Sequence, residues 1–182
     1  MNLAGVRTTT PLRTALDLAC NVKRADALSA LDAFARQHHV SREALLSGLE
    51  RFKGRRGVIQ ARELVLLMDP RAESERETRL RLALADAGLP APRPQWVVII
   101  DGHEFRLDLA YPAHRVGVEY DGEEWHGTEE QRRHDNLRRR LLEKAGWVVI
   151  VVRRGDFSPA RMDSWLSDVR DALEGRYTSL RW

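Results

Sequence analysis

The segment EFRLDLAYPAHRVGVEYDG, residues 104–122, contains two runs with the alternating pattern of a β-strand. In the run 104–111, every second residue from Phe105 to Tyr111 is apolar, so these side chains are expected to share one face of a strand. The run 115–121 alternates in the same way. The short loop between the runs predicts an antiparallel pair of strands.

The same segment places two acidic residues where they would meet. If Tyr111 pairs with Val116 across the loop, Asp108 lies directly opposite Glu119, with β-carbons about 5 Å apart. Like charges at that distance repel, and a divalent cation between them removes the repulsion. Magnesium is typically held by one or two carboxylates together with substrate phosphate. We therefore predict that Asp108 and Glu119 bind Mg²⁺ or Mn²⁺.

Working outward from this pair, the chain alternates between helix and strand signals. The predicted elements are a helix from Ser74 to Gly88, strands Gln95–Asp101, Glu104–Tyr111 and Arg115–Asp121, a helix from Thr128 to Gly146, a strand Trp147–Val152, and a helix from Ser158 to about Glu174. This order predicts an α/β fold, with a mixed sheet flanked by helices.

Glu77 adds a third carboxylate by a separate argument. Its helix carries an apolar stripe formed by Leu80, Leu84 and Ala87, and Glu77 lies on the same stripe. A carboxylate at the end of a face that packs on the core is a candidate for the acidic site. The simpler interpretation is that Glu77 only completes a capping box with Ser74.

Residues 1–70 show a different pattern. Helical spacing of apolar residues predicts four short helices, at Leu12–Cys20, Ala25–Phe34, Glu43–Leu49 and Val58–Met68. The region carries eleven Lys and Arg against seven Asp and Glu. We predict a basic helical region at 1–70, a hinge near Pro70, and a second domain at 71–182.

Composition restricts the class of protein. The net charge is +3 and the pI about 9.4, which permits a nucleic-acid partner. No apolar run approaches the roughly 18 residues of a membrane helix, and no secretory signal is recognisable. The single cysteine, Cys20, excludes a disulfide framework within the chain. We expect a cytoplasmic protein that needs neither a membrane nor a small-molecule cofactor.

Arginines are concentrated in one stretch after the acidic pair. They are Arg132, Arg133, Arg138, Arg139 and Arg140. The cluster suits a surface that holds phosphates, although a solvated helix face would have the same composition.

A set of short motifs carries a family resemblance. They are Glu77-Thr78-Arg79, Ala87-Gly88-Leu89-Pro90, Arg106-Leu107-Asp108, Val118-Glu119-Tyr120-Asp121-Gly122, Trp125-His126, Arg133 with Asp135, and Leu141 to Gly146-Trp147. In this order they resemble the PD-(D/E)XK nuclease superfamily. The similarity is greatest to small bacterial domains related to the very-short-patch repair (Vsr-like) endonucleases and to EDxHD homing endonucleases. It covers about residues 73–155 and implies a restriction-endonuclease-like αβββαβ core.

The resemblance also implies roles for individual residues. Asp108 would be the central metal ligand, Glu119 the second acid and Glu77 the helix-borne glutamate. The position at which the superfamily usually has lysine is Asp121 here, which leaves the identity of the general base open.

His126 matches a histidine of the repair endonucleases. It would act as a base or stabiliser within reach of Asp135, although a surface histidine beside a turn is the alternative. Arg133, Arg138 and Arg139 would neutralise DNA phosphates. Trp125 would stack on bases or, alternatively, pack against the sheet edge.

A second resemblance concerns the N-terminal region. Residues 8–19, TTTPLRTALDLA, are similar to the middle of longer proteins that join an AbiEi-like antitoxin region to such a nuclease domain. Those proteins usually start with a winged-helix segment, which we do not find in this sequence.

Two functions of different classes follow. The first is a magnesium-dependent DNA endonuclease with a role in repair, mobile elements or defence. The alternative is a non-catalytic DNA-binding or toxin–antitoxin regulatory protein that retains a nuclease fold.

Overall fold

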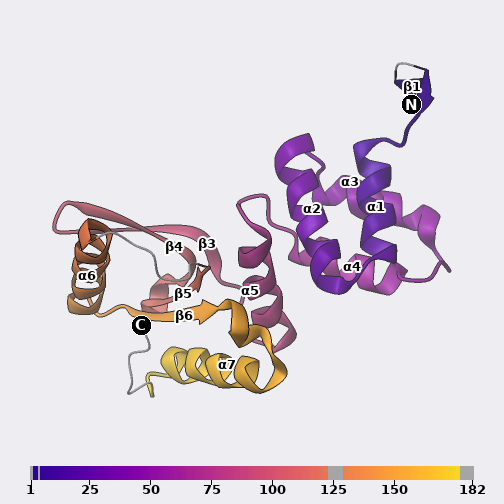
Figure 1. The fold of residues 1–182 in the computed structure, drawn as a ribbon. Helices are drawn as coiled ribbons and strands as arrows, with labels where there is room; N and C mark the ends of the chain where they lie inside the picture. Colours follow the sequence, from indigo (N-terminus) through magenta and orange to yellow (C-terminus); the bar gives the residue numbers. More distant parts are fainter. Residues whose placement is uncertain (1, 4, 123–128, 177–182) are drawn as a thin grey trace. The chain divides into compact units, whose positions relative to one another are not determined.

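A computed structural model describes residues 2–3, 5–122 and 129–176. The chain divides into two compact units, Met1–Leu82 and Ala83–Trp182 (Figure 1). Each unit has its own arrangement of secondary structure.

The first unit is helical, as its apolar spacing predicts. It contains α1 (Pro11–Asn21), α2 (Arg24–His38), α3 (Arg42–Leu49), α4 (Val58–Leu67), the short 3₁₀ helix Glu50–Phe52 and the start of α5 (Glu75–Asp86). Thr10 and Ser41 begin α1 and α3, because each side chain accepts a hydrogen bond from a backbone N–H three residues on. A short hairpin of β1 (Asn2–Leu3) and β2 (Val6–Arg7) precedes α1, and its sequence carries no strand signal that predicted it.

A buried polar cluster fixes the start of α5 within the helical unit. Asp32 of α2 accepts hydrogen bonds from the Asp69 N–H at 2.8 Å and the Thr78 hydroxyl at 2.7 Å, and it forms an ion pair with Arg81. Burial raises the pKa of Asp32, an effect that Arg81 and the hydrogen bonds oppose. Because breaking such a buried pair is strongly destabilising, this cluster holds α5 on α2.

The second unit is built on a four-stranded sheet. It contains β3 (Arg93–Ile100), β4 (His103–Tyr111), β5 (Val116–Asp121), α6 (Glu129–Lys144), β6 (Val148–Arg153) and α7 (Pro159–Leu173), with 3₁₀ turns at Pro112–His114 and Arg154–Phe157. The strand order is β3-β4-β5-β6 (Figure 1). The first three strands run antiparallel and β6 runs parallel to β5, so the predicted mixed α/β fold and its αβββαβ order are confirmed.

Local sequence signals explain how these strands begin and end. The two-residue turn Asp101-Gly102 joins β3 to β4, with φ of 49° and 80° at its two positions. Both angles lie in the left-handed region that Asp-Gly hairpin turns require. On the sheet, Leu142 of α6 packs with Trp147 and Val149 in an apolar cluster.

The pairing of β4 with β5 has the predicted register. Tyr111 pairs with Val116, and the ladder continues to Leu109 and Val118. Val118 is its last partner residue on β5, so the ladder ends one step before Asp108 and Glu119. Asp108 and Glu119 therefore lie on neighbouring strands, one residue beyond the last pair, Leu109 and Val118.

The prediction of uninterrupted alternation along β4 is wrong. Leu107 and Ala110 belong to the same apolar cluster, although strict alternation places them on opposite faces. The ladder of β3 with β4 steps from Pro94–Leu109 to Trp96–Leu107, and Gln95 between them has a φ of 54°. A left-handed residue at this point interrupts the pleat next to Asp108.

Within the described ranges, no helix is both long enough and apolar enough to cross a membrane.

Candidate active site

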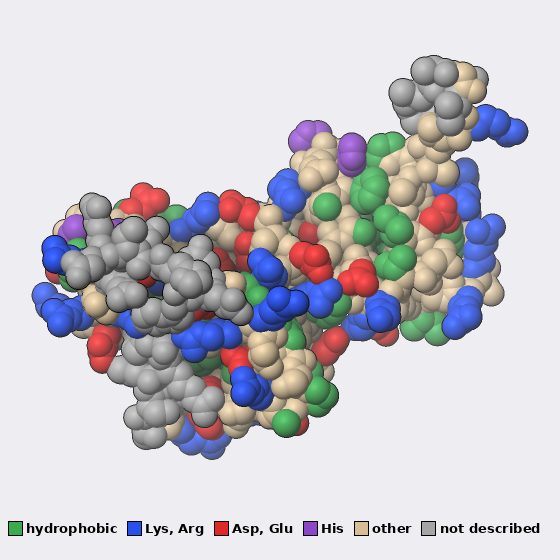
Figure 2. All heavy atoms as spheres, viewed as in Figure 1, with side chains coloured by type: hydrophobic (Ala, Val, Ile, Leu, Met, Phe, Trp, Pro, Cys, Tyr) green, Lys and Arg blue, Asp and Glu red, His purple; other side chains and the backbone are tan. Residues whose placement is uncertain are grey.

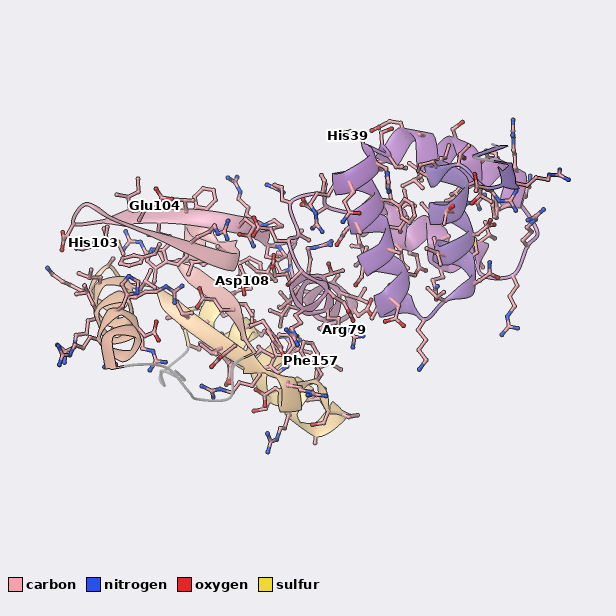
Figure 3. All side chains as sticks on the ribbon, turned by 45° about the horizontal axis from the view of Figure 1, so that its top comes forward. His39, Arg79, His103, Glu104, Asp108 and Phe157 are labelled. Atoms are coloured by element: carbon pink, nitrogen blue, oxygen red, sulfur yellow. The ribbon has the colours of Figure 1, made fainter. Side chains whose placement is uncertain are left out.

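Asp108 lies at the interruption in β4. Its side chain is half-buried, and its Oδ2 accepts a hydrogen bond from the backbone N–H of Tyr120 at 2.9 Å. Figure 3 shows Asp108 well along β4 from the hairpin end, where His103 and Glu104 lie. The carboxylate of Asp108 thus reaches across to β5 at the residue that follows Glu119.

Glu119 is held by an arginine of α6. Arg138 donates from Nη1 to Glu119 Oε2 at 3.0 Å and from Nη2 to Glu119 Oε1. The Arg138 and Glu119 side chains are only 22% and 15% exposed. Two parallel charge-assisted hydrogen bonds between partly buried groups are stronger and more specific than an ordinary surface ion pair.

Three carboxylates act on this guanidinium. Burial lowers the pKa of Arg138, but the hydrogen bond to Glu119 and the negative charges of Glu119, Asp108 and Asp135 outweigh burial and raise the pKa above its ordinary value. Asp108, Glu119 and Asp135 thus all act on the same cation, Arg138. We call these three residues the acidic cluster.

A pocket opens beside the acidic cluster. It has a volume of about 230 Å³ and is lined by Glu119, Tyr120, Asp121, Asp135, Arg138, Arg139 and Val151. Asp121 also forms an ion pair with Arg153 of β6 at 3.3 Å. The pocket therefore brings together the predicted site residues of β5 and α6.

The remaining predicted residues do not line this pocket in the part of the chain that the structure describes. Trp125 and His126 fall outside the described residues. Arg133 is exposed on α6, about 140° around the helix from Arg138 at 100° per residue.

Glu77 belongs to the helical unit and is buried. Its carboxylate accepts a hydrogen bond from the Glu73 N–H at 3.1 Å, and its own N–H donates to the Ser74 hydroxyl at 3.2 Å. The capping function expected of Ser74 is confirmed. A role for Glu77 as a third carboxylate of the site remains a prediction.

The sequence interpretation missed the partner of Arg138. It assigned this side chain to DNA phosphate, whereas the structure places it on Glu119. One signal was present: Arg138 and the buried Leu142 are four residues apart and so share the face of α6 that packs on the sheet.

The donor set suits a hard divalent cation. Asp108 and Glu119 supply two carboxylates, and a cationic guanidinium already lies among the acidic cluster. Across the part of the chain that the structure describes, no three His, Cys, Asp or Glu side chains gather into a metal site. A cation at Asp108 and Glu119 would therefore complete its coordination with water and substrate phosphate, as magnesium usually does.

Two family matches cover most of the chain. Residues 77–173 match the restriction-endonuclease-like family REase_MTES_1575, and residues 1–67 match the AbiEi antitoxin C-terminal domain. The matched segments correspond to the sheet-containing part and to the helical part of the chain.

Two curated relatives come from Mycobacterium tuberculosis. They are Uncharacterized protein MT2308, of strain CDC 1551 / Oshkosh, and Uncharacterized protein Rv2248, of strain ATCC 25618 / H37Rv. Each is 35% identical to the chain over 151 residues, which is 82% of this chain and 56% of the relative. The chain thus spans little more than half the length of these relatives. No solved structure is significantly similar to it.

The family match covers the mixed sheet, both acidic residues and the arginine of α6. The chain therefore belongs to the restriction-endonuclease-like family REase_MTES_1575, and its residues 1–67 are similar to the AbiEi antitoxin C-terminal domain.

Proposed function

We propose that the protein is a metal-dependent DNA endonuclease whose site is centred on Asp108 and Glu119. The observation that carries the proposal is that Asp108 and Glu119 lie just beyond the last β4–β5 pair on adjacent strands, where Asp108 binds the Tyr120 N–H and Glu119 binds Arg138. The restriction-endonuclease-like family supports hydrolysis of a phosphodiester as the reaction.

Each residue of the site has a distinct task in this proposal. Asp108 and Glu119 would hold Mg²⁺ or Mn²⁺, which when bound polarises a phosphoryl oxygen and lowers the pKa of a water ligand. The Tyr120 N–H fixes the orientation of the Asp108 carboxylate. Arg139, on the pocket wall, would neutralise a DNA phosphate.

Deprotonation of the attacking water needs a base other than lysine. Asp121 occupies the position of the superfamily lysine, and its carboxylate is paired with Arg153. We assign the base to His126, with Asp135 as its partner, by the resemblance to the Vsr-like repair endonucleases. A role in repair, mobile-element transfer or phage defence belongs to the same proposal.

DNA as the partner also agrees with the charge of the helical unit. Residues 1–70 carry eleven Lys and Arg against seven Asp and Glu. Figure 2 shows many Lys and Arg side chains on the surface of this unit. Contacts of that kind bind phosphates without reading sequence.

A second candidate function has its own support. The match to the AbiEi antitoxin C-terminal domain, together with the pairing of Glu119 by Arg138, favours a toxin–antitoxin regulatory protein that retains a nuclease fold without cleaving DNA.

A cleavage assay separates the two candidates. Wild-type protein, Asp108→Asn and Asp101→Asn would be incubated with plasmid and with mixed single- and double-stranded DNA, in Mg²⁺, in Mn²⁺ and in EDTA. Asn at position 108 keeps an oxygen that accepts the Tyr120 N–H, so the change removes mainly the charge. Asp101, in the exposed hairpin turn, is the matched control.

The proposal predicts metal-dependent cleavage by the wild type and by Asp101→Asn. Asp108→Asn should lose about 100-fold or more in rate, since a bound metal contributes several kcal/mol of charge stabilisation. Equal cleavage by Asp108→Asn, or cleavage that persists in EDTA, would contradict the proposed site. Absence of cleavage with every metal and substrate would favour the regulatory function.

A further inference from the structure

Arg138 forms two hydrogen bonds with the Glu119 carboxylate, to which a divalent cation would also bind. Its two terminal nitrogens each bond one carboxylate oxygen, so both oxygens of Glu119 are engaged. Arg138 Nη2 also lies 3.5 Å from the carbonyl oxygen of Arg106 on β4. The guanidinium of α6 therefore contacts both β4 and β5.

The charges of the acidic cluster explain why the arginine is needed when no metal is bound. Asp108, Glu119 and Asp135 would repel one another without a cation. Arg138 is the residue on which all three act, and the pair that it forms with Glu119 is mostly shielded from solvent. In the absence of metal it therefore offsets one of the three negative charges of the acidic cluster.

A metal ion and the guanidinium compete for the same oxygens. Magnesium binds carboxylate oxygens at about 2.0–2.1 Å and is surrounded by six ligands. A guanidinium held by both oxygens of Glu119 leaves little room for that geometry, and the two cations repel each other. Metal binding to Glu119 thus competes with the Arg138 hydrogen bonds, since both cations use the same two oxygens.

We propose that Arg138 is a positioning residue that exchanges with the divalent cation on Glu119. In the metal-free protein Arg138 neutralises Glu119. When metal binds, Arg138 leaves this carboxylate. The Arg138 guanidinium then faces the pocket beside Arg139, where a DNA phosphate would lie. The exchange rests on the proposed metal-dependent function and adds a mechanism that couples metal binding to phosphate binding.

The experiment measures Mn²⁺ affinity without DNA, by the loss of the free-ion electron paramagnetic resonance signal on titration. Wild-type protein is compared with Arg138→Gln, Arg138→Lys and Arg140→Gln. Arg140 lies on the same helix and is exposed, so Arg140→Gln makes the same change of charge away from Glu119. Circular dichroism in EDTA verifies that each variant is folded.

Arg138→Gln should bind Mn²⁺ about tenfold more tightly than the wild type, because one charge-assisted competitor has been removed. Arg138→Lys should fall between the two, since an ammonium retains the charge and loses the two-pronged contact. Arg140→Gln should match the wild type. In EDTA, Arg138→Gln should melt at a lower temperature than Arg140→Gln, and Mn²⁺ should reduce that difference.

The outcomes distinguish this proposal from the function on which it rests. If the wild type binds Mn²⁺ and Arg138→Gln binds it equally or more weakly, the exchange is overturned and the metal site stands. If neither protein binds Mn²⁺, both proposals fall. Binding by Arg138→Gln alone would also overturn the exchange, because it would show that Arg138 blocks the site permanently. If Arg138→Gln fails to fold, the Mn²⁺ affinities of Arg138→Lys and the wild type are compared. Tighter binding by Arg138→Lys supports the exchange, and equal or weaker binding overturns it.

Discussion

At the scale of single residues, Asp108 and Arg138 each combine a structural contact with a place in the proposed chemistry. Asp108 accepts the Tyr120 N–H and so links β4 to β5 after their ladder has ended. Arg138 links α6 to β5 through Glu119. Their substitution therefore changes both the stability of the sheet and the charge of the site, and Asp108→Asn is the change that keeps the shape of the side chain while it removes the charge.

Tyr111, three residues from Asp108, should make the free energy of unfolding depend on pH. Its hydroxyl donates to the Pro90 carbonyl at 2.9 Å, and burial raises the pKa of the phenol far above its ordinary value of 10.0. A group whose folded pKa is raised stabilises the fold fully below its unfolded pKa and loses that contribution as pH rises above it. The free energy of unfolding should therefore fall as pH rises beyond about 10.

The measurement is urea unfolding at a series of pH values for the wild type and Tyr111→Phe. At neutral pH, Tyr111→Phe should lower the free energy of unfolding by about 1 kcal/mol through the lost hydrogen bond. Above pH 10 the difference should shrink, because phenylalanine has no proton to lose. A difference that stays constant or grows with pH would show that the buried phenol does not cause the dependence.

At the scale of elements, α6 presents two faces with different tasks. Arg138, Arg139 and Leu142 lie towards the pocket and the sheet, whereas Arg133 and Arg140 are exposed. Of the arginines that looked equivalent in the sequence, these four described ones therefore divide between two faces. Arg139 is the best placed of the described residues to contact a phosphate in the pocket, and Arg133 would contact DNA only where it extends over the outer face.

This division predicts how salt affects DNA binding. Each phosphate neutralised by an arginine contributes about 0.9 to the slope of log affinity against log salt. Arg139→Gln should lower the slope by about one and weaken binding to all sequences alike. Arg133→Gln should lower it by less. Fluorescence anisotropy at several salt concentrations measures both slopes, and an unchanged slope for Arg139→Gln would exclude a phosphate contact.

Local sequence signals predicted most of the element boundaries in the described residues. Asp101-Gly102 predicted the hairpin because its residues tolerate left-handed backbone, and the short loop after Tyr111 fixed the register with Val116. The interruption at Gln95 had no such signal, because a positive φ is uncommon for glutamine and depends on the surrounding sheet.

The site was less accessible to prediction than the fold. The acidic residues of β4 and β5 followed from strand periodicity and register. The pairing of Glu119 with Arg138 joins residues 19 positions apart and depends on how α6 packs against the sheet. The spacing of Arg138 and Leu142 indicates which face of α6 packs on the sheet, but it does not specify which strand residue Arg138 contacts.

At the scale of the whole molecule, the chain joins two segments with separate family matches. The helical segment matches the AbiEi antitoxin C-terminal domain, and the segment with the mixed sheet matches the restriction-endonuclease-like family. The helical unit has its own buried cluster around Asp32 and its own apolar core. Under the functions proposed above, DNA cleavage and regulation would meet in one protein, so both are tested with the full chain.

The central claim is that Asp108 and Glu119 hold a divalent cation, and crystals soaked in Mn²⁺ test it most directly. An anomalous difference map should show one peak between the two carboxylates, with oxygen ligands at about 2.0–2.2 Å and at least one Arg138 nitrogen withdrawn from Glu119. A map without a peak at this place, in which Arg138 still binds both oxygens of Glu119 at saturating Mn²⁺, would contradict the account.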